Sequence, residues 1–182
     1  MNLQSNDFEL FDIPARFAQN RAALEARWKD LQREAHPDRF SQHGVAAQRV
    51  ALQWSVRINE AYQRLKDPLK RAAYLCDLNG APVNAENNTA MPTDFLMRQM
   101  QWRESLGEAV GPAELNRISM EVVSAQRESL QKCEHLLDVE RNYEQAVQQV
   151  RALMFIERFV RDVEDRLDSQ DAPITSTAGK GQ

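Results

Sequence analysis

The length, composition and charge of this chain exclude several classes of protein. Its 182 residues are enough for one domain or two small ones, and the shares of hydrophobic (42%) and charged (27%) residues are ordinary for a soluble globular protein. The net charge of −4 argues against a protein that binds nucleic acid through bulk positive charge. No apolar run approaches the roughly 20 residues that cross a bilayer, and the acidic N-terminus "MNLQSNDFELFD" does not resemble a signal or transit peptide.

The usage of glycine, proline and cysteine indicates the fold class and the compartment. Only 6 glycines and 7 prolines are present, and β-branched and aromatic residues do not alternate with polar ones, so an all-α fold is predicted. The two cysteines, Cys76 and Cys133, are far apart and lack the spacing of metal ligands. Together with the N-terminal sequence, they favour a reduced, cytoplasmic location and no membrane association.

The first two predicted helices begin at recognisable capping residues. Asn6 is expected to cap a short helix over residues 7–11, and Asn20 a second helix over about 21–35. In the second helix, apolar residues recur at spacings of four, three and four, at Leu24, Trp28, Leu31 and Ala35.

Two further helices are predicted before residue 79. A third helix over residues 45–66 carries an apolar stripe made of Ala47, Val50, Trp54, Ile58, Ala61 and Leu65. Asp67 and Pro68 should cap and start a fourth helix that ends near residue 78. We expect the second and third helices to pack as an antiparallel hairpin.

A change of composition marks the expected domain boundary. Residues 79–92 ("NGAPVNAENNTAMP") hold four asparagines, one glycine and two prolines, which is typical of a linker. Three more helices, at about 93–106, 111–137 and 140–167, have short connections and should form a small bundle. The predicted organisation is an N-terminal domain over 1–78, a linker over 79–92, a three-helix bundle over 93–168 and a disordered tail over 169–182.

His36-Pro37-Asp38 interrupts the helical pattern between the second and third helices. The triplet could be a simple turn, part of a metal site, a catalytic dyad or a contact surface for another protein. A metal site needs several converging ligands, and the other histidines, His43 and His135, share no ligand spacing with His36. A catalytic dyad needs a nucleophile and a pocket, whereas the tip of a helical hairpin is convex. A contact surface is therefore favoured, and neither a metal nor another cofactor is expected.

Basic side chains flank the triplet. Lys29 and Arg33 lie one turn apart, away from the apolar stripe of their helix, and should face solvent. Arg39 directly follows the triplet. Asp30 and Glu34 dilute the positive charge of the same helix, and each basic residue taken alone could be an ordinary solvated charge.

The helix predicted over residues 93–106 has two opposed apolar faces. At 100° per residue, one packing stripe consists of Phe95, Gln99, Trp102 and Leu106. Leu96, Met97 and Met100 fall on the other side, and Phe155 lies outside the main apolar arc of the last helix. The second face is either sandwiched between neighbours or available to a partner, and methionines suit adaptable binding surfaces.

The setting of the triplet resembles a J-domain, the module with which co-chaperones engage DnaK-type ATPases. The similarity rests on "HPDRF" between two antiparallel helices and on "RINEAYQRLKDPLKRAAYL" at residues 57–75. The resemblance implies that the turn contacts the chaperone and promotes ATP hydrolysis there. The implied chaperone-binding residues are His36, Pro37, Asp38, Lys29, Arg33 and Arg39.

Over residues 7–167 the chain is similar to HscB-type co-chaperones of iron–sulfur cluster assembly, and the bundle helix "FLMRQMQWRESL" carries that similarity. This implies a non-enzymatic adaptor whose J-domain engages an HscA-type chaperone and whose bundle binds an IscU-type scaffold protein. The implied scaffold-binding residues are Leu96, Met97, Met100, Gln101, Glu104 and Phe155. Family members can carry a glutamate where this chain has Gln101, and the N-terminal zinc-binding cysteines of some eukaryotic members are absent here.

Three other functions stay open at this stage. The bundle could bind a different client protein, the methionine face could drive a structural oligomer, or the triplet could belong to a hydrolase.

Overall fold

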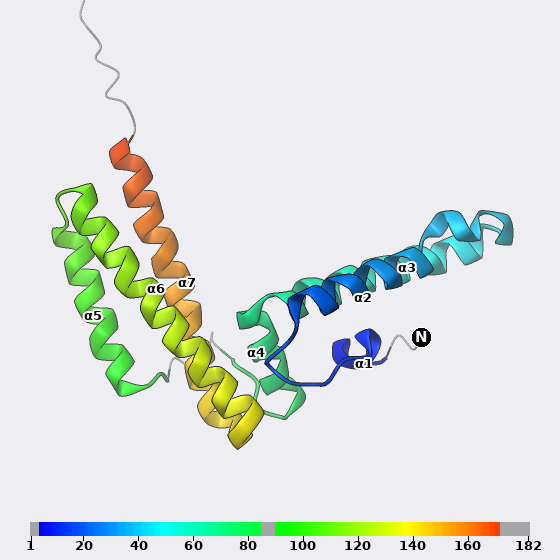
Figure 1. Ribbon diagram of the computed structural model, residues 1–182, viewed down its shortest axis with the longest axis horizontal. Coiled ribbons are helices and arrows are strands. Elements are labelled where there is room, and N and C mark those ends of the chain that lie inside the picture. The colour runs from blue at the N-terminus through cyan, green and yellow to red at the C-terminus, as the bar shows by residue number, and fades with distance from the viewer. Residues whose placement is uncertain (1–3, 85–89, 172–182) are drawn as a thin grey trace, which may run out of the picture.

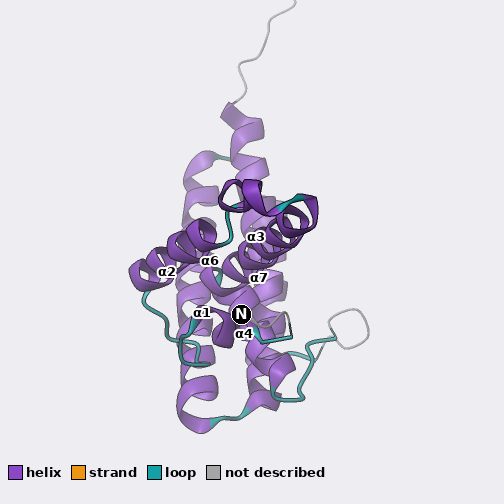
Figure 2. Cartoon of the chain, turned by 90° about the vertical axis from the view of Figure 1, so that its right-hand side faces the viewer, coloured by secondary structure: helices purple, strands orange, loops and turns teal. Residues whose placement is uncertain are grey.

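The computed structural model describes residues 4–84 and 90–171, apart from the side chains of residues 41, 43, 170 and 171. Within these ranges the chain forms helices and loops and contains no β-strand, as Figure 2 shows, so the prediction of an all-α fold is confirmed. None of the helices in these ranges combines the length and apolar composition needed to cross a membrane.

The N-terminal helices begin where the capping residues predict. They are α1 (Asp7–Phe11), α2 (Arg21–Glu34), α3 (Val45–Lys66) and α4 (Pro68–Leu78). The side chains of Asn6, Asn20 and Asp67 each accept a hydrogen bond from the backbone N–H three residues later, which satisfies a donor that the helix itself leaves unpaired. Local sequence therefore determines the starts of α1, α2 and α4.

Helices α2 and α3 form the expected antiparallel hairpin, which projects from the rest of the molecule (Figure 1). Its buried contacts come from Leu24 and Leu31 of α2, from Ala35 directly after α2, and from Ile58, Ala61 and Leu65 of α3. Val50 is half exposed, although the apolar stripe of α3 predicts it to be buried. Helix α2 ends at Glu34, so this end of α3 packs against the short 3-10 helix η1 (Pro37–His43) instead.

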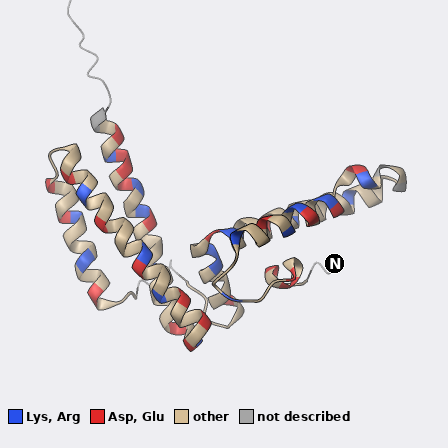
Figure 3. Ribbon diagram, in the orientation of Figure 1, with Lys and Arg blue, Asp and Glu red and all other residues tan. Residues whose placement is uncertain are grey.

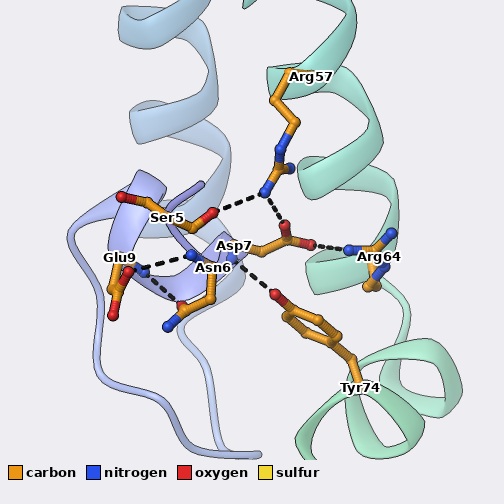
Figure 4. A network of polar contacts seen from close by, with 7 residues as sticks. All are labelled: Ser5, Asn6, Asp7, Glu9, Arg57, Arg64 and Tyr74. Atoms are coloured by element: carbon orange, nitrogen blue, oxygen red, sulfur yellow. Dashed lines mark hydrogen bonds and ion pairs between the residues drawn. The ribbon is translucent and has the colours of Figure 1, made fainter. Parts of the chain in front are cut away.

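A buried carboxylate anchors α1 to the hairpin, as Figure 4 shows. The side chain of Asp7 is fully buried, and its two oxygens lie 2.6 Å from Arg57 Nη2 and 2.6 Å from Arg64 Nη1. The backbone N–H of Asp7 donates a hydrogen bond to the hydroxyl of Tyr74, on α4, at 3.0 Å. One aspartate thus holds α1, α3 and α4 together.

The C-terminal helices differ from the prediction at their ends. They are α5 (Thr93–Glu108), α6 (Pro112–Glu134), a π-helical turn η2 (His135–Glu140) and α7 (Tyr143–Asp171). Helix α5 is predicted to end near residue 106, but it continues to Glu108, with Gly107 inside its last turn. A loop is predicted directly after residue 137, but the π-helical turn occupies residues 135–140 instead.

The predicted linker and tail are only partly described. Helix α7 continues to Asp171, so the first three residues of the tail expected over 169–182 are helical. Residues 85–89 of the expected linker and residues 172–182 of the expected tail lie outside the described residues. On either side of the first gap, the carbonyls of Val83 and Ala90 accept hydrogen bonds from the buried guanidinium of Arg151 at 2.7–3.2 Å.

Two apolar clusters stabilise the fold, and they do not divide at the expected linker. The whole of α5, the part of α6 up to Ala125 and the part of α7 from Ala152 enclose one cluster, which includes Phe95, Trp102, Ile118 and Ile156. The other contains the cores of α1 to α4 together with Cys133, Leu136, Val147, Val150 and other residues of α6, η2 and α7. Helix α7 and the turn η2 therefore pack against α4, at the junction between the N-terminal and C-terminal helices, which are the two arms of the molecule (Figure 1).

Candidate partner-binding surfaces

The His36-Pro37-Asp38 turn lies at the free end of the hairpin, far from the bundle (Figure 1). His36 caps η1: its Nδ1 accepts a hydrogen bond from the backbone N–H of Asp38 at 3.3 Å, and Pro37 occupies the first helical position. Gly44 closes the turn with φ 86° and ψ 168°, a conformation that residues other than glycine rarely adopt. The turn is therefore ordered by its own local contacts.

The functional groups of the turn point into solvent. The Asp38 side chain is 90% exposed and the His36 side chain is 56% exposed. The Asp38 carboxylate lies 3.6 Å from His36 Nδ1, the nitrogen that accepts the backbone N–H of Asp38. An exposed carboxylate on an ordered turn is suited to pair with an arginine of another protein.

Lys29 and Arg33 are exposed as predicted, but each is paired with an acidic residue of α2. Lys29 lies 2.8 Å from Glu25, and Arg33 lies 3.0 Å from Asp30. The pairing raises the pKa of Lys29 and lowers the pKa of Glu25, in both cases through the hydrogen bond between them. Figure 3 shows acidic and basic positions interleaved along the hairpin.

Arg39 makes hydrogen bonds to backbone carbonyls at the end of α2 and in the turn. Its Nη1 donates a long hydrogen bond of 3.4 Å to the carbonyl of Arg33, near the end of α2. Its backbone N–H donates to the carbonyl of His36 at 3.1 Å. A basic side chain at a helix C-terminus satisfies a carbonyl and interacts favourably with the helix dipole, so Arg39 connects the turn to α2.

A polar network fixes α2 against α3, and sequence periodicity did not reveal it. Trp28 Nε1 and Gln32 Nε2 both donate to Asn59 Oδ1, at 2.9 and 2.8 Å. The Ser55 hydroxyl donates to Gln32 Oε1 at 2.7 Å, and Trp28 stacks on Tyr62 with 4.7 Å between ring centres. These directional contacts set the register of the two helices that carry the turn.

An apolar pocket of about 490 Å³ lies beside the turn. Its lining comes from the end of α2, from η1 and from the first turns of α3, and includes Ala35, Phe40, Ala47, Val50 and Trp54. The turn thus presents a charged group and an apolar hollow on the same end of the hairpin.

The second face of α5 is exposed, and we call Leu96, Met97 and Met100 the methionine face. Their exposed fractions are 40%, 65% and 71%, whereas Phe95 and Trp102 on the opposite stripe are buried. The two-faced pattern predicted for this helix is confirmed, and of the two arrangements that the sequence left open, the structure has the exposed one.

Phe155 has a mixed environment beside this face. Its ring stacks on Phe159 at 5.9 Å and meets Phe95 edge-on at 5.7 Å, so part of it belongs to the bundle core. The guanidinium of Arg103 lies 5.2 Å from the centre of the Phe155 ring. Arg103, which the sequence did not single out, therefore covers one candidate binding residue.

Gln101 and Glu104 are exposed on α5 and line a groove of about 580 Å³ between α5 and α6. The same groove is lined by Glu108, Glu121 and Glu128, and the last of these pairs with Arg98 at 3.1 Å. The polar edge of the methionine face is therefore mainly acidic. Among the described residues, no group of three or more His, Cys, Asp or Glu side chains is arranged to hold a metal ion.

Comparison with known proteins identifies the family of a chain with these two surfaces. It is 45% identical to a protein named "Co-chaperone protein HscB homolog" from Burkholderia multivorans, over 166 residues that cover 90% of this chain and 94% of that protein. The homolog from Paraburkholderia xenovorans is 44% identical over 170 residues, which cover 92% and 97% of the two chains. The chain belongs to the HscB co-chaperone family.

Solved HscB structures share the fold of this family member. Chaperone HscB from Vibrio cholerae superposes with a TM-score of 0.77 and 34% identity, covering 91% of this chain and 99% of that one. Human co-chaperone HscB gives a TM-score of 0.80 and 26% identity, covering 96% and 86%. Residues 91–164 also match the family model described as the HSCB C-terminal oligomerisation domain.

Membership of the HscB family gives names to the two arms. Helices α1 to α4 form the N-terminal J-domain, and α5 to α7 form the C-terminal helical bundle. The His36-Pro37-Asp38 turn is at the tip of the J-domain, and the methionine face is on the outer helix of the bundle (Figure 1). The relatives are co-chaperones, a class of protein that is not itself enzymatic.

Proposed function

We propose that the protein is an adaptor that binds an IscU-type iron–sulfur scaffold protein, delivers it to an HscA-type DnaK-like chaperone and stimulates the ATPase of that chaperone. One observation carries the proposal. An ordered, exposed His36-Pro37-Asp38 turn lies at the tip of the J-domain, in a chain that belongs to the HscB co-chaperone family. The cytoplasmic location expected from the sequence accompanies this proposal and stays a prediction.

The chaperone is proposed to bind the tip of the J-domain. Asp38 supplies an exposed carboxylate for an arginine of the chaperone, and Pro37 and the His36 cap reduce the entropy lost when the turn is fixed. Lys29 and Arg33 would join the contact by exchanging their partners on α2 for acidic groups of the chaperone. Arg39 would contribute mainly by holding the turn against α2.

The scaffold is proposed to bind the methionine face. Met97 and Met100 supply flexible apolar area, Phe155 extends the area onto α7, and Gln101 and Glu104 form the polar edge. Leu96, which is less exposed than either methionine, completes the apolar centre. The two proposed surfaces lie on different arms, so the chain can hold both partners at once (Figure 1).

The decisive experiment measures ATP hydrolysis by the purified HscA-type chaperone with and without this chain. Asp38→Asn removes the charge and keeps the size of the side chain, and we expect stimulation to fall by about 30-fold, since losing one partner of a buried charged contact costs at least about 2 kcal/mol. Scaffold binding by the same variant should be unchanged. Asp77→Asn makes the same chemical change at an exposed position on α4 and should stimulate normally.

Normal stimulation by Asp38→Asn would reject the proposed role of the turn. If the unsubstituted chain stimulates the chaperone but does not bind the scaffold, the alternative of a J-domain co-chaperone with a different client replaces the proposal.

Self-association is a second candidate function for the bundle. The matching family model is described as an oligomerisation domain, and the methionine face is an exposed apolar surface within it. Light scattering at several concentrations separates the two functions, because a stable oligomer that protects Met97 and Met100 from oxidation would leave no free face for the scaffold.

A further inference from the structure

The π-helical turn between α6 and α7 carries a contact that joins the two arms. Asp138, in the middle of η2, accepts hydrogen bonds from two successive backbone N–H groups of the loop between α1 and α2. Phe17 N–H donates to Oδ1 at 2.6 Å and Ala18 N–H donates to Oδ2 at 2.8 Å. Turns of π-helix are rare and often occur at functional sites, and here the extra residues direct a carboxylate toward the J-domain.

The same loop is held from its other side by a buried arginine. Arg71 of α4 is 8% exposed, and its Nε donates to the carbonyl of Phe17 at 2.8 Å. A second nitrogen of its guanidinium donates to the carbonyl of Leu65, and the group lies 5.0 Å from the centre of the Phe17 ring. The N–H of Phe17 thus pairs with a negatively charged carboxylate, and its carbonyl pairs with a positively charged guanidinium.

Apolar packing alone does not fix the orientation of the J-domain relative to the bundle, whereas these hydrogen bonds do. The J-domain and the lower ends of α6 and α7 share one apolar cluster, but apolar burial is non-directional. Hydrogen bonds to a carboxylate have restricted lengths and angles. Ala18 also lies only two residues before Asn20, the cap of α2, so a constraint on the loop is a constraint on the start of α2.

We propose that Asp138 is a positioning residue that fixes the direction of α2, and with it the His36-Pro37-Asp38 turn, relative to the bundle. Its functional consequence rests on the proposed function: a scaffold on the methionine face is then presented to the chaperone at a set angle while the turn is engaged. Two contacts made at once from a rigid frame strengthen each other through effective concentration, and a loose frame loses that gain.

Orientation can be measured without any partner protein. Gln53→Cys of α3 and Ser124→Cys of α6 place nitroxide labels at two exposed positions of the full chain. Pulsed electron–electron double resonance then measures the distance between the two arms. The native Cys76 and Cys133 are fully buried and will not take the label. We expect one narrow distance population in the parent chain, and a broadened or second population in Asp138→Ala and Asp138→Asn.

The matched control removes a charge from the same turn without touching the loop. Glu140 pairs with His135 at 2.9 Å on the exposed side of η2, and Glu140→Gln should keep the narrow distribution. Circular dichroism at the labelling temperature checks that each variant is folded. If Asp138→Ala unfolds, Asp138→Asn, which retains one acceptor oxygen, provides the comparison. An unchanged distribution in the folded Asp138 variants would overturn the proposal.

The functional arm compares the concentration of co-chaperone that gives half-maximal ATPase stimulation, with and without bound scaffold. We expect Asp138→Ala to raise this concentration about tenfold for the scaffold-loaded chain and to leave the maximal rate and the value for the chain alone unchanged. Equal effects with and without scaffold would indicate a structural role only and would overturn the functional consequence. Failure of the parent chain to stimulate would reject the proposed function, while the distance measurement would still decide the role of Asp138.

Discussion

The buried Asp7 and the partly exposed Arg64 form an ion pair, with 2.6 Å between the Asp7 carboxylate and Arg64 Nη1. Asp7 is fully buried in the first turn of α1, whereas Arg64 reaches it from the last turns of α3 with part of its side chain in solvent. Arg57 lies at 2.6 Å from the other oxygen, so the carboxylate is compensated on both sides (Figure 4). A helix of five residues is too short to be stable alone, and this contact holds α1 in place together with the burial of Phe8, Leu10 and Phe11.

Replacing Asp7 with asparagine should strongly destabilise the J-domain. The substitution leaves two arginines facing an uncharged amide. Because both arginines are partly exposed, the loss should be about 2 kcal/mol, below the value for breaking a fully buried pair. Urea unfolding followed by circular dichroism measures the loss. Glu121→Gln, which breaks the exposed pair with Arg117 on α6, should cost about 0.3 kcal/mol or less. Similar losses for the two variants would show that the Asp7 network contributes little.

The methionine face should be needed for binding and dispensable for folding. Replacing both Met97 and Met100 with serine removes exposed side chains, so the melting temperature should change little, while scaffold affinity falls by about tenfold or more. Isothermal titration calorimetry with the purified scaffold measures the affinity. Leu52→Ser, at a position 56% exposed on the other arm, is the control and should bind normally.

Phe155→Ala should give a different result, because this ring is partly core. It loses contacts with Phe95 and Phe159 as well as any contact with a partner, so both the melting temperature and scaffold affinity should fall. Phe155→Leu, which keeps apolar volume, should restore most of the stability. A binding loss that persists in Phe155→Leu assigns the ring to the interface, and full recovery of binding would assign it to the core alone.

The two cysteine thiols should be unreactive in the folded protein. Burial raises the pKa of Cys76 to about 11 and that of Cys133 to about 12, so both remain protonated at pH 8 and inaccessible to reagents. An assay with a chromogenic disulfide should detect no thiol in the native chain at pH 8 and two after denaturation. Rapid native reaction of either thiol would show that the junction between the arms opens readily.

Glu157 should make stability depend on pH at the junction of α7 with α4. Burial raises the pKa of its carboxyl above the ordinary value of 4.5, and the charge of Asp67 adds to the effect. The folded state is therefore favoured by protonation, and this contribution is lost as the pH rises through the folded pKa. Glu157→Gln should raise the melting temperature at pH 7 and have little effect below pH 4.5, whereas Asp162→Asn, exposed on the same helix, should show no such difference.

The sequence by itself determined the features that depend on residues close together along the chain. Asn6, Asn20 and Asp67 predicted three helix starts because a capping side chain bonds to a backbone group three residues away. The exposed turn at His36-Pro37-Asp38 and the two faces of α5 also followed from local pattern. Patterns of this kind fix which side chains share a face, since helix geometry repeats every 3.6 residues.

Only the tertiary structure decided the contacts between residues that are far apart in sequence. The pairing of Asp138 with Phe17 and Ala18, the two arginines around Asp7, and the cover of Arg103 over Phe155 have no signature in local periodicity. The inclusion of α6 and α7 in the core of the J-domain is of the same kind, because an apolar stripe shows that a surface is buried but not which partner buries it. Partner choice depends on shape and directional bonds, and these exist only once the helices are assembled.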